Sequence, residues 1–215
     1  ELMGIVTAGD TTVAYVRALS GLEPVGTTTA TWDAATGRFV TQSEYLFTGD
    51  RPAWGDAAIE HDGKIYALGC TPRTAFVHDC SVARVSADAF HDRSAYEFYR
   101  GAGDYSPDPD DAWPLFEGGH GLAMVRVDDR FRVYYVPPLG NTVVERWGLG
   151  PDGPWSAPLE VARCDLAEHV LCSGVDVHPR WNEGGLAVTY GRFSFESVDP
   201  ALLSTQLIQI AAGER

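Results

Sequence analysis

AAIEHDGKIYALG, residues 57–69, is the stretch that decides the fold class. In its second half two sets of residues alternate, Ile65, Ala67 and Gly69 against Lys64, Tyr66 and Leu68. A period of two residues is that of a β-strand. Asp62-Gly63 precedes this run and is a residue pair typical of tight hairpin turns. The stretch therefore predicts two antiparallel strands joined by a short turn.

Two later stretches repeat this pattern. Residues 121–136 and 174–191 each contain a strand, an acidic or glycine-containing turn and an aromatic-rich strand. Turn signals recur between alternating runs along the chain, at 9–10, 35–37, 62–63, 128–129, 152–154 and 183–185. No long stretch keeps a helical period. Repeats that each build one small sheet are typical of a β-propeller.

The repeats extend outward into sheets of about four strands. Further strands are expected after the second and third hairpins, at 80–86, 95–100, 141–149 and 155–162. The first repeat, 4–48, has strands at 11–18, 27–33 and 38–47. Residues 101–114, rich in Asp, Pro and Gly, are expected to form a surface loop between blades. We predict one domain over 1–215, with approximate blades 1–50, 51–116, 117–172 and 173–215.

Closure of the ring is left open by the sequence. The last blade stops after the strand at 203–211 and shows no outer strand. A propeller closes its ring to hide sheet edges. Either four blades are closed by the first residues, or an additional N-terminal blade belongs to the protein. The chain begins at Glu1 without an initiator methionine, which is consistent with a removed signal peptide or a longer N-terminal segment.

Charge excludes two classes of partner. The 215 residues include 16 basic and 30 acidic side chains, for a formal net charge of −14. A chain so acidic is repelled by a phosphate backbone and by an anionic membrane surface. No stretch approaches the roughly 20 apolar residues of a membrane-spanning helix. We therefore expect neither a nucleic acid nor a membrane partner.

The four cysteines predict two local disulfides, Cys70–Cys80 and Cys164–Cys172. Each pair could close one loop or hairpin, and free buried thiols are the alternative. The tight Cys or His pairs of a zinc site do not occur. Disulfides persist in oxidising compartments, so we expect a secreted, extracellular protein.

Several motifs resemble bacterial five-bladed propellers of the arabinanase-like glycosidase superfamily. They are Trp54-Gly55-Asp56-Ala57, Asp62 to Tyr66, Val82 to Val85, Asp92 to Phe98, Gly153-Pro154-Trp155-Ser156 and His178-Pro179 followed by Leu186 to Tyr190. Together they are most similar to a large domain family that includes endo-D-arabinanases, and the resemblance covers about 5–210. It implies an all-β propeller, with about four blades visible of a five-bladed ring, whose innermost strands present carboxylates to a glycan.

The resemblance also implies a function. We expect a secreted glycoside hydrolase-like protein that acts on a furanose-containing polysaccharide such as arabinan. Leu122 stands where relatives tend to place a glutamate, and Glu117 is the nearest carboxylate. A non-catalytic propeller that binds a glycan or another protein is therefore the alternative. The oligomeric state stays open.

Glycoside hydrolysis generally needs two carboxyl groups, one protonated and one ionised. Asp56, Glu117 and Asp176 are the candidate catalytic residues, because each lies at or near the start of an expected innermost strand. The alternative for each is a solvated carboxylate in a turn.

Five further residues are candidates for sugar binding: Trp54, His120, His178, Tyr190 and Arg192. Aromatic faces and convergent polar groups are typical of such sites. Asp176 and His178 are two residues apart in a strand and should share one face. Each aromatic residue could instead fill the space between blades, and each histidine could be structural. No metal site and no cofactor is expected, although the resemblance leaves an axial calcium ion open.

Overall fold

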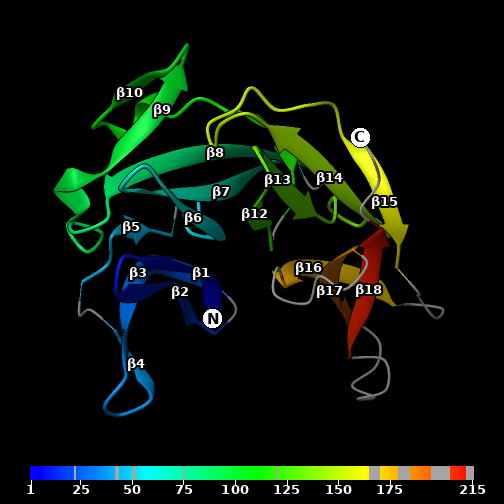
Figure 1. The fold of residues 1–215 in the computed structure, drawn as a ribbon, viewed down its shortest axis with the longest axis horizontal. Coiled ribbons are helices and arrows are strands. Elements are labelled where there is room, and N and C mark those ends of the chain that lie inside the picture. Colours follow the sequence, from blue (N-terminus) through cyan, green and yellow to red (C-terminus); the bar gives the residue numbers. More distant parts are fainter. Residues whose placement is uncertain are drawn as a thin grey trace.

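The computed structural model describes residues 1–21, 23–41, 44–49, 52–74, 76–119, 121–164, 170–178, 185–194 and 204–211. These residues form four separate antiparallel sheets. Figure 1 follows the chain from the blue first sheet at the lower left, over the top, to the red last sheet at the lower right. We call these sheets blades 1 to 4.

Blade 1 has the strand order β1-β2-β3-β4, with β5 paired to β3. Its strands are β1 (Leu2–Ala8), β2 (Thr11–Ser20), β3 (Glu23–Asp33), β4 (Arg38–Thr41) and β5 (Phe47–Thr48). Blade 2 has the order β10-β9-β8-β7-β6, with β11 paired to β8. Its strands are β6 (Ala57–His61), β7 (Lys64–Thr74), β8 (Val77–Ser86), β9 (Glu97–Gly101), β10 (Asp104–Ser106) and β11 (Phe116–Gly118).

Blades 3 and 4 are simpler meanders. Blade 3 has the order β12-β13-β14-β15 and consists of β12 (Ala123–Val127), β13 (Arg130–Tyr135), β14 (Thr142–Gly148) and β15 (Leu159–Arg163). The described strands of blade 4 are β16 (Leu171–His178), β17 (Gly185–Phe193) and β18 (Thr205–Ala211). Two single-turn 3-10 helices, Arg93–Ala95 and Pro109–Asp111, complete the described elements. Among them, no helix is long and apolar enough to cross a membrane.

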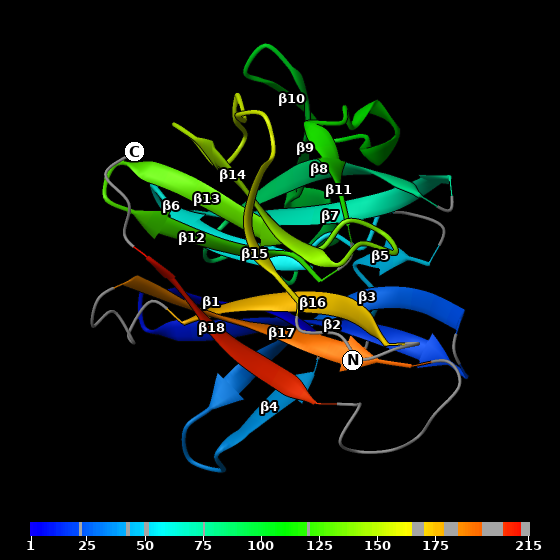
Figure 2. The ribbon, with the colours of Figure 1, turned by 90° about the vertical axis from the view of Figure 1, so that its right-hand side faces the viewer.

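The first strand of each blade lies innermost, so β1, β6, β12 and β16 approach a common centre (Figures 1 and 2). Contacts between blades run in series from β1 to β6, from β6 to β12 and from β12 to β16. A contact of comparable extent between β16 and β1 is absent from the described part of the chain. The sequence-based prediction of an all-β propeller with about four visible blades is confirmed.

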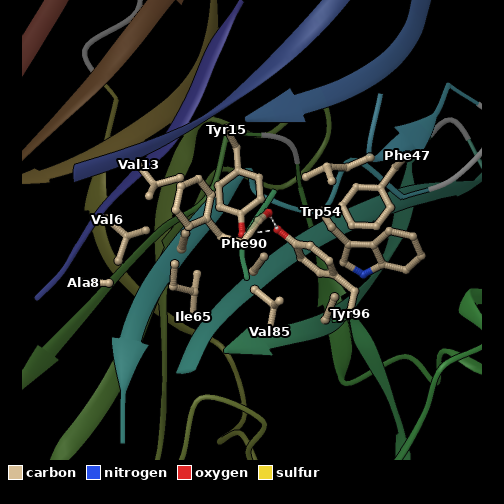
Figure 3. Close-up of a cluster of buried hydrophobic side chains, with 14 of the residues drawn as sticks. Val6, Ala8, Val13, Tyr15, Phe47, Trp54, Ile65, Val85, Phe90 and Tyr96 are labelled. Carbon is tan, nitrogen blue, oxygen red and sulfur yellow. Dashed lines mark hydrogen bonds between the residues drawn. The ribbon is translucent and has the colours of Figure 1, made fainter. Parts of the chain in front are cut away.

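Apolar clusters fill the spaces between successive blades. Figure 3 shows the cluster between blades 1 and 2, where Val13, Tyr15 and Ile65 are fully buried. Its two tyrosines are hydrogen-bonded, with 3.0 Å between the hydroxyl oxygens of Tyr15 and Tyr96. Similar clusters join blade 2 to blade 3 and blade 3 to blade 4. Adjacent blades are therefore held mainly by burial of apolar surface.

The Asp62-Gly63 hairpin is confirmed, with φ angles of 50° and 75°, as the type I′ turn requires. One loop prediction was wrong in part. Residues 104–106 form the short strand β10, because a turn at Gly101–Gly103 with three positive φ angles brings the chain back onto β9. Both predicted disulfides, Cys70–Cys80 and Cys164–Cys172, are present.

We expect Gly121→Ala to lower the free energy of unfolding by about 2 to 4 kcal/mol, which a urea unfolding curve would measure. Gly121 has a φ of +64°, and a Cβ there would lie 2.5 Å from the Gly174 Cα of blade 4. Gly63→Ala is the matched control, because its φ is +75° but nothing lies within 4 Å of its Cβ position. Equal losses in the two variants would show that blades 3 and 4 do not meet at Gly121.

The Cys70–Cys80 bond should contribute about 2 to 3 kcal/mol to stability, because it constrains a loop in the unfolded chain. The two cysteines are 10 residues apart and lie opposite each other on β7 and β8. A Cys70→Ala/Cys80→Ala double variant should lose this amount in chemical denaturation. If a reductant lowers the free energy of unfolding of that variant and of the wild type equally, the Cys70–Cys80 bond does not make the expected contribution to stability.

Candidate functional site

A pocket of about 990 Å³ lies where the innermost strands meet. We call it the axial pocket. Residues from β1, β6, β12 and β16 line it, together with parts of β2, β8 and β17. Its acidic, basic and histidine lining residues are Glu1, Arg17, Asp56, His78, Asp176 and His178. Two of the three predicted catalytic carboxylates, Asp56 and Asp176, therefore border one cavity.

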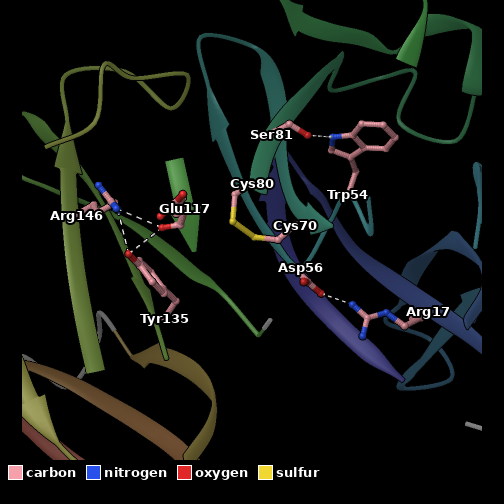
Figure 4. Close-up of a disulfide and its surroundings, with 9 residues drawn as sticks. All are labelled: Arg17, Trp54, Asp56, Cys70, Cys80, Ser81, Glu117, Tyr135 and Arg146. Carbon is pink, nitrogen blue, oxygen red and sulfur yellow. Dashed lines mark hydrogen bonds and ion pairs between the residues drawn. A yellow bond between two sulfur atoms is a disulfide. The ribbon is translucent and has the colours of Figure 1, made fainter. Parts of the chain in front are cut away.

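Asp56 lies immediately before β6 and connects three blades. Its Oδ1 accepts a 2.6 Å hydrogen bond from Nη2 of Arg17, which is in β2 of blade 1 (Figure 4). The backbone N–H of Gly121, just before β12 of blade 3, also lies close enough to favour the charged form of this carboxylate. Asp56 itself belongs to blade 2 and is 7% exposed. The carboxylate thus ties blades 1, 2 and 3 together at the axis.

Burial determines the protonation of Asp56. Loss of contact with water raises the pKa of its carboxyl group to about 6, although the neighbouring Arg17 guanidinium lowers it. Glu1, whose Oε2 lies 3.2 Å from Nη1 of the same arginine, raises the pKa further. A carboxyl group with a pKa near 6 is partly protonated close to neutral pH, so it can donate a proton as well as accept hydrogen bonds.

Asp176 has a different environment. It lies exposed on β16, directly opposite Thr189 of β17. His178 shares its face, and its Nε2 lies 3.0 Å from the Thr189 hydroxyl. Val175, on the opposite face, is buried against blade 3. The Asp176 side chain is therefore open to water, whereas Asp56 is largely shielded from it.

Besides the N-terminal Glu1, the pocket residues Arg17 and His78 were not predicted from the sequence. Arg17 lies two residues beyond Tyr15 on the buried face of β2, and His78 lies two residues before Cys80 on the buried face of β8. A polar residue in register with buried apolar neighbours was the signal in both cases. Burial lowers the pKa of His78, so its imidazole is neutral at neutral pH.

The third predicted catalytic residue, Glu117, lies elsewhere. It is exposed on β11, where its side chain forms an ion pair with Arg73. In Figure 4 it lies with Tyr135 and Arg146, apart from the Asp56–Arg17 pair. It lines a second pocket of about 370 Å³ and does not line the axial one. The structure thus separates Glu117 from the two other carboxylates.

The predicted sugar-binding residues are also dispersed. Trp54 is fully buried between Phe47 and Phe98 and donates a hydrogen bond from Nε1 to the Ser81 hydroxyl, so its ring presents no face to a ligand. Tyr190 borders the axial pocket but is 2% exposed, within the cluster between blades 3 and 4.

Arg192 does not line the axial pocket, and its guanidinium donates to the Ser204 hydroxyl, with Nη2 at 2.6 Å. His178 is the predicted sugar-binding residue that the structure places beside Asp176. His120 lies outside the described residues. Within the described part of the chain, no three His, Cys, Asp or Glu residues are grouped so that they could hold a metal ion.

No protein-family model and no curated protein matches this chain. Solved structures do. A thermostable family-43 glycoside hydrolase superposes with a TM-score of 0.61 at 11% identity, over 95% of this chain and 69% of that one. An α-L-arabinofuranosidase from Lactobacillus brevis has a TM-score of 0.57 at 12% identity, over 94% and 69% of the two chains.

An α-L-arabinanase from Cellvibrio cellulosa has a TM-score of 0.55 at 10% identity, covering 95% of this chain and 71% of its own. At identities of 10% to 12% these similarities establish the fold. The chain shares the propeller fold of these glycosidases, and its activity has to be argued from its own site.

We expect the free energy of unfolding to fall by up to about 3 kcal/mol as the pH rises from about 4 to about 6, owing to Asp56. The pKa of Asp56 is about 6 in the folded chain and 3.8 for an ordinary aspartate. Between these values the folded state holds the extra proton, so deprotonation destabilises it relative to the unfolded chain. Urea unfolding of the wild type and of Asp56→Asn across this range would measure the difference.

Asp10→Asn, at an exposed carboxylate in the β1–β2 turn, is the control and should keep the wild-type pH profile. Parallel profiles for the wild type and Asp56→Asn would contradict the raised pKa.

Proposed function

We propose that the axial pocket binds and hydrolyses a furanose-containing polysaccharide such as arabinan, with Asp56 as general acid and Asp176 as the second carboxylate. The observation that carries the proposal is that two carboxylates in unlike environments border one pocket. Environments that push two carboxyl pKa values apart are how glycosidases divide the roles of acid and base. Asp56 is buried with a raised pKa, and Asp176 is exposed.

The residues around each carboxylate support these roles. The 2.6 Å hydrogen bond from Arg17 fixes the orientation of the Asp56 carboxyl group, which is among the groups that line the pocket. On β16, His178 and Asp176 point to one face, where the imidazole could bind a sugar hydroxyl. The lining combines these polar groups with apolar side chains, as is usual for small-molecule sites.

The substrate class comes from the neighbours. Two of the superposed structures are named for arabinan-type substrates, an arabinanase and an arabinofuranosidase. An acidic pocket also disfavours anionic ligands and is compatible with a neutral glycan. Arabinan is therefore the first substrate to test.

A glycan-binding propeller without catalysis is the second candidate. Leu122, which stands where relatives tend to place a glutamate, is 3% exposed and lines the axial pocket. The Asp56 carboxylate is also engaged by structural hydrogen bonds. Both observations favour a pocket that has kept its shape but has lost one of the two catalytic carboxyl groups.

The proposal also includes secretion of the protein and a fifth blade. The two disulfides support secretion into an oxidising compartment. A fifth blade between blades 4 and 1 is supported by the series of contacts, which runs from β1 to β16 through β6 and β12.

We expect Asp56→Asn and Asp176→Asn each to lower the release of oligosaccharides from arabinan by about 100-fold or more. Asparagine can accept the hydrogen bond from Arg17 but has no proton to transfer at neutral pH. Product chromatography with arabinan, xylan and galactan would measure turnover, and thermal unfolding would show that the variants are folded.

Asp128→Asn, in the exposed β12–β13 turn, is the control and should keep full turnover. Arabinan binding without any release of products by the wild type would favour the non-catalytic alternative. Undiminished turnover in Asp56→Asn would reject its role as the acid.

A further inference from the structure

The second pocket adjoins the axial pocket. Pro137 and Pro138, in the loop between β13 and β14, line both of them. The loop is held by a hydrogen bond from the Gly140 N–H to the Pro137 carbonyl, 2.8 Å long. Each proline also has a fixed φ angle. Pro137 and Pro138 thus form a short, stiff ridge between the two pockets.

The residues that line the second pocket are suited to a neutral, hydroxylated ligand. Phe76, near the turn between β7 and β8, is 67% exposed and lines it. The charged lining residues are Glu117, Glu160 and Arg146, and Glu117 is paired with Arg73. Acidic and basic groups nearly balance, so neither an anion nor a cation is favoured strongly. An exposed aromatic ring beside such groups is suited to the apolar face and hydroxyls of a sugar.

Arg146 is fixed in position before any ligand arrives. It donates from Nε to the Tyr135 hydroxyl at 3.0 Å and from Nη2 to the Glu117 carbonyl at 3.2 Å (Figure 4). Its Nη1 donates to the Ser156 carbonyl at 2.7 Å. A guanidinium has five N–H donors, so these bonds leave two. A preorganised donor gives up little entropy on binding.

We propose that the second pocket binds sugar residues of the same glycan whose other part occupies the axial pocket, with the chain passing over the Pro137–Pro138 ridge. The inference rests on the proposed function, because it needs a glycan in the axial pocket. It goes further in assigning the polymer a second binding region beside the axial pocket. It also gives Glu117 and Phe76 a place in substrate recognition, away from the reacting bond.

The test compares short and long arabino-oligosaccharides. The wild type should bind thio-linked arabinohexaose, which it cannot hydrolyse during the titration, at least about tenfold more tightly than thio-linked arabinobiose by titration calorimetry, since the longer chain reaches both pockets. Phe76→Ala removes an exposed ring and should lower affinity for the hexamer by about fivefold to tenfold. The ratio of the two affinities should fall towards one. Glu160→Gln, at an exposed residue of β15, is a second variant expected to lower the same ratio.

Trp32→Ala is the matched control, because Trp32 is a partly exposed aromatic residue of blade 1 that lines neither pocket. It should keep the wild-type ratio. Equal affinity of the wild type for the two sugars, or a hexamer affinity unchanged in Phe76→Ala and in Glu160→Gln, would overturn the second site and leave the axial site standing. Absence of binding by either sugar would overturn the proposed function and this inference together.

Discussion

The centre of the molecule depends on the interaction of the Asp56 carboxylate with the Arg17 guanidinium and with the nearby Gly121 N–H. It joins side chain or backbone from blades 1, 2 and 3 at the point where their innermost strands begin. The apolar clusters between blades are larger contributors to stability, but they are non-directional. The carboxylate is directional, since each of its bonds requires one orientation of a neighbouring blade. The carboxylate therefore helps to set the shape of the axial pocket, whereas the apolar clusters only surround it.

Much of the architecture follows from local sequence. Alternation in 57–69 and 121–136, with turn residues between the strands, was enough to predict hairpins, and repetition of the hairpins was enough to predict a propeller. Side chains in a strand point alternately to two faces, so the pairing of Asp176 with His178 on one face could also be predicted. Both cysteine pairs were correct because each closes a short segment within or beside one blade.

The site was less predictable, because its geometry depends on how blades meet. Trp54 and Asp56 are two residues apart, yet one side chain fills the space between blades and the other borders the axis. Glu117 looked axial from its place before β12, but it belongs to β11, which pairs with β8 and carries it to the neighbouring pocket. Arg17 lies 39 residues from Asp56 in the sequence, and only the packing of blade 1 on blade 2 brings them together. Local patterns carry no information about such contacts.

The chemistry at position 56 bears on whether the pocket is more than a structural centre. Burying a carboxylate costs free energy that an Arg partner offsets only in part, and here the net effect is a pKa raised to about 6. An asparagine could accept the hydrogen bond from Arg17 without that cost. Asparagine would thus fill a purely structural role at position 56 as well as aspartate does, although it does not titrate. What aspartate adds is a proton that can be gained and lost near neutral pH, in a pocket that also contains the exposed Asp176. That difference is the physical basis on which the proposed function gives Asp56 a role in proton transfer.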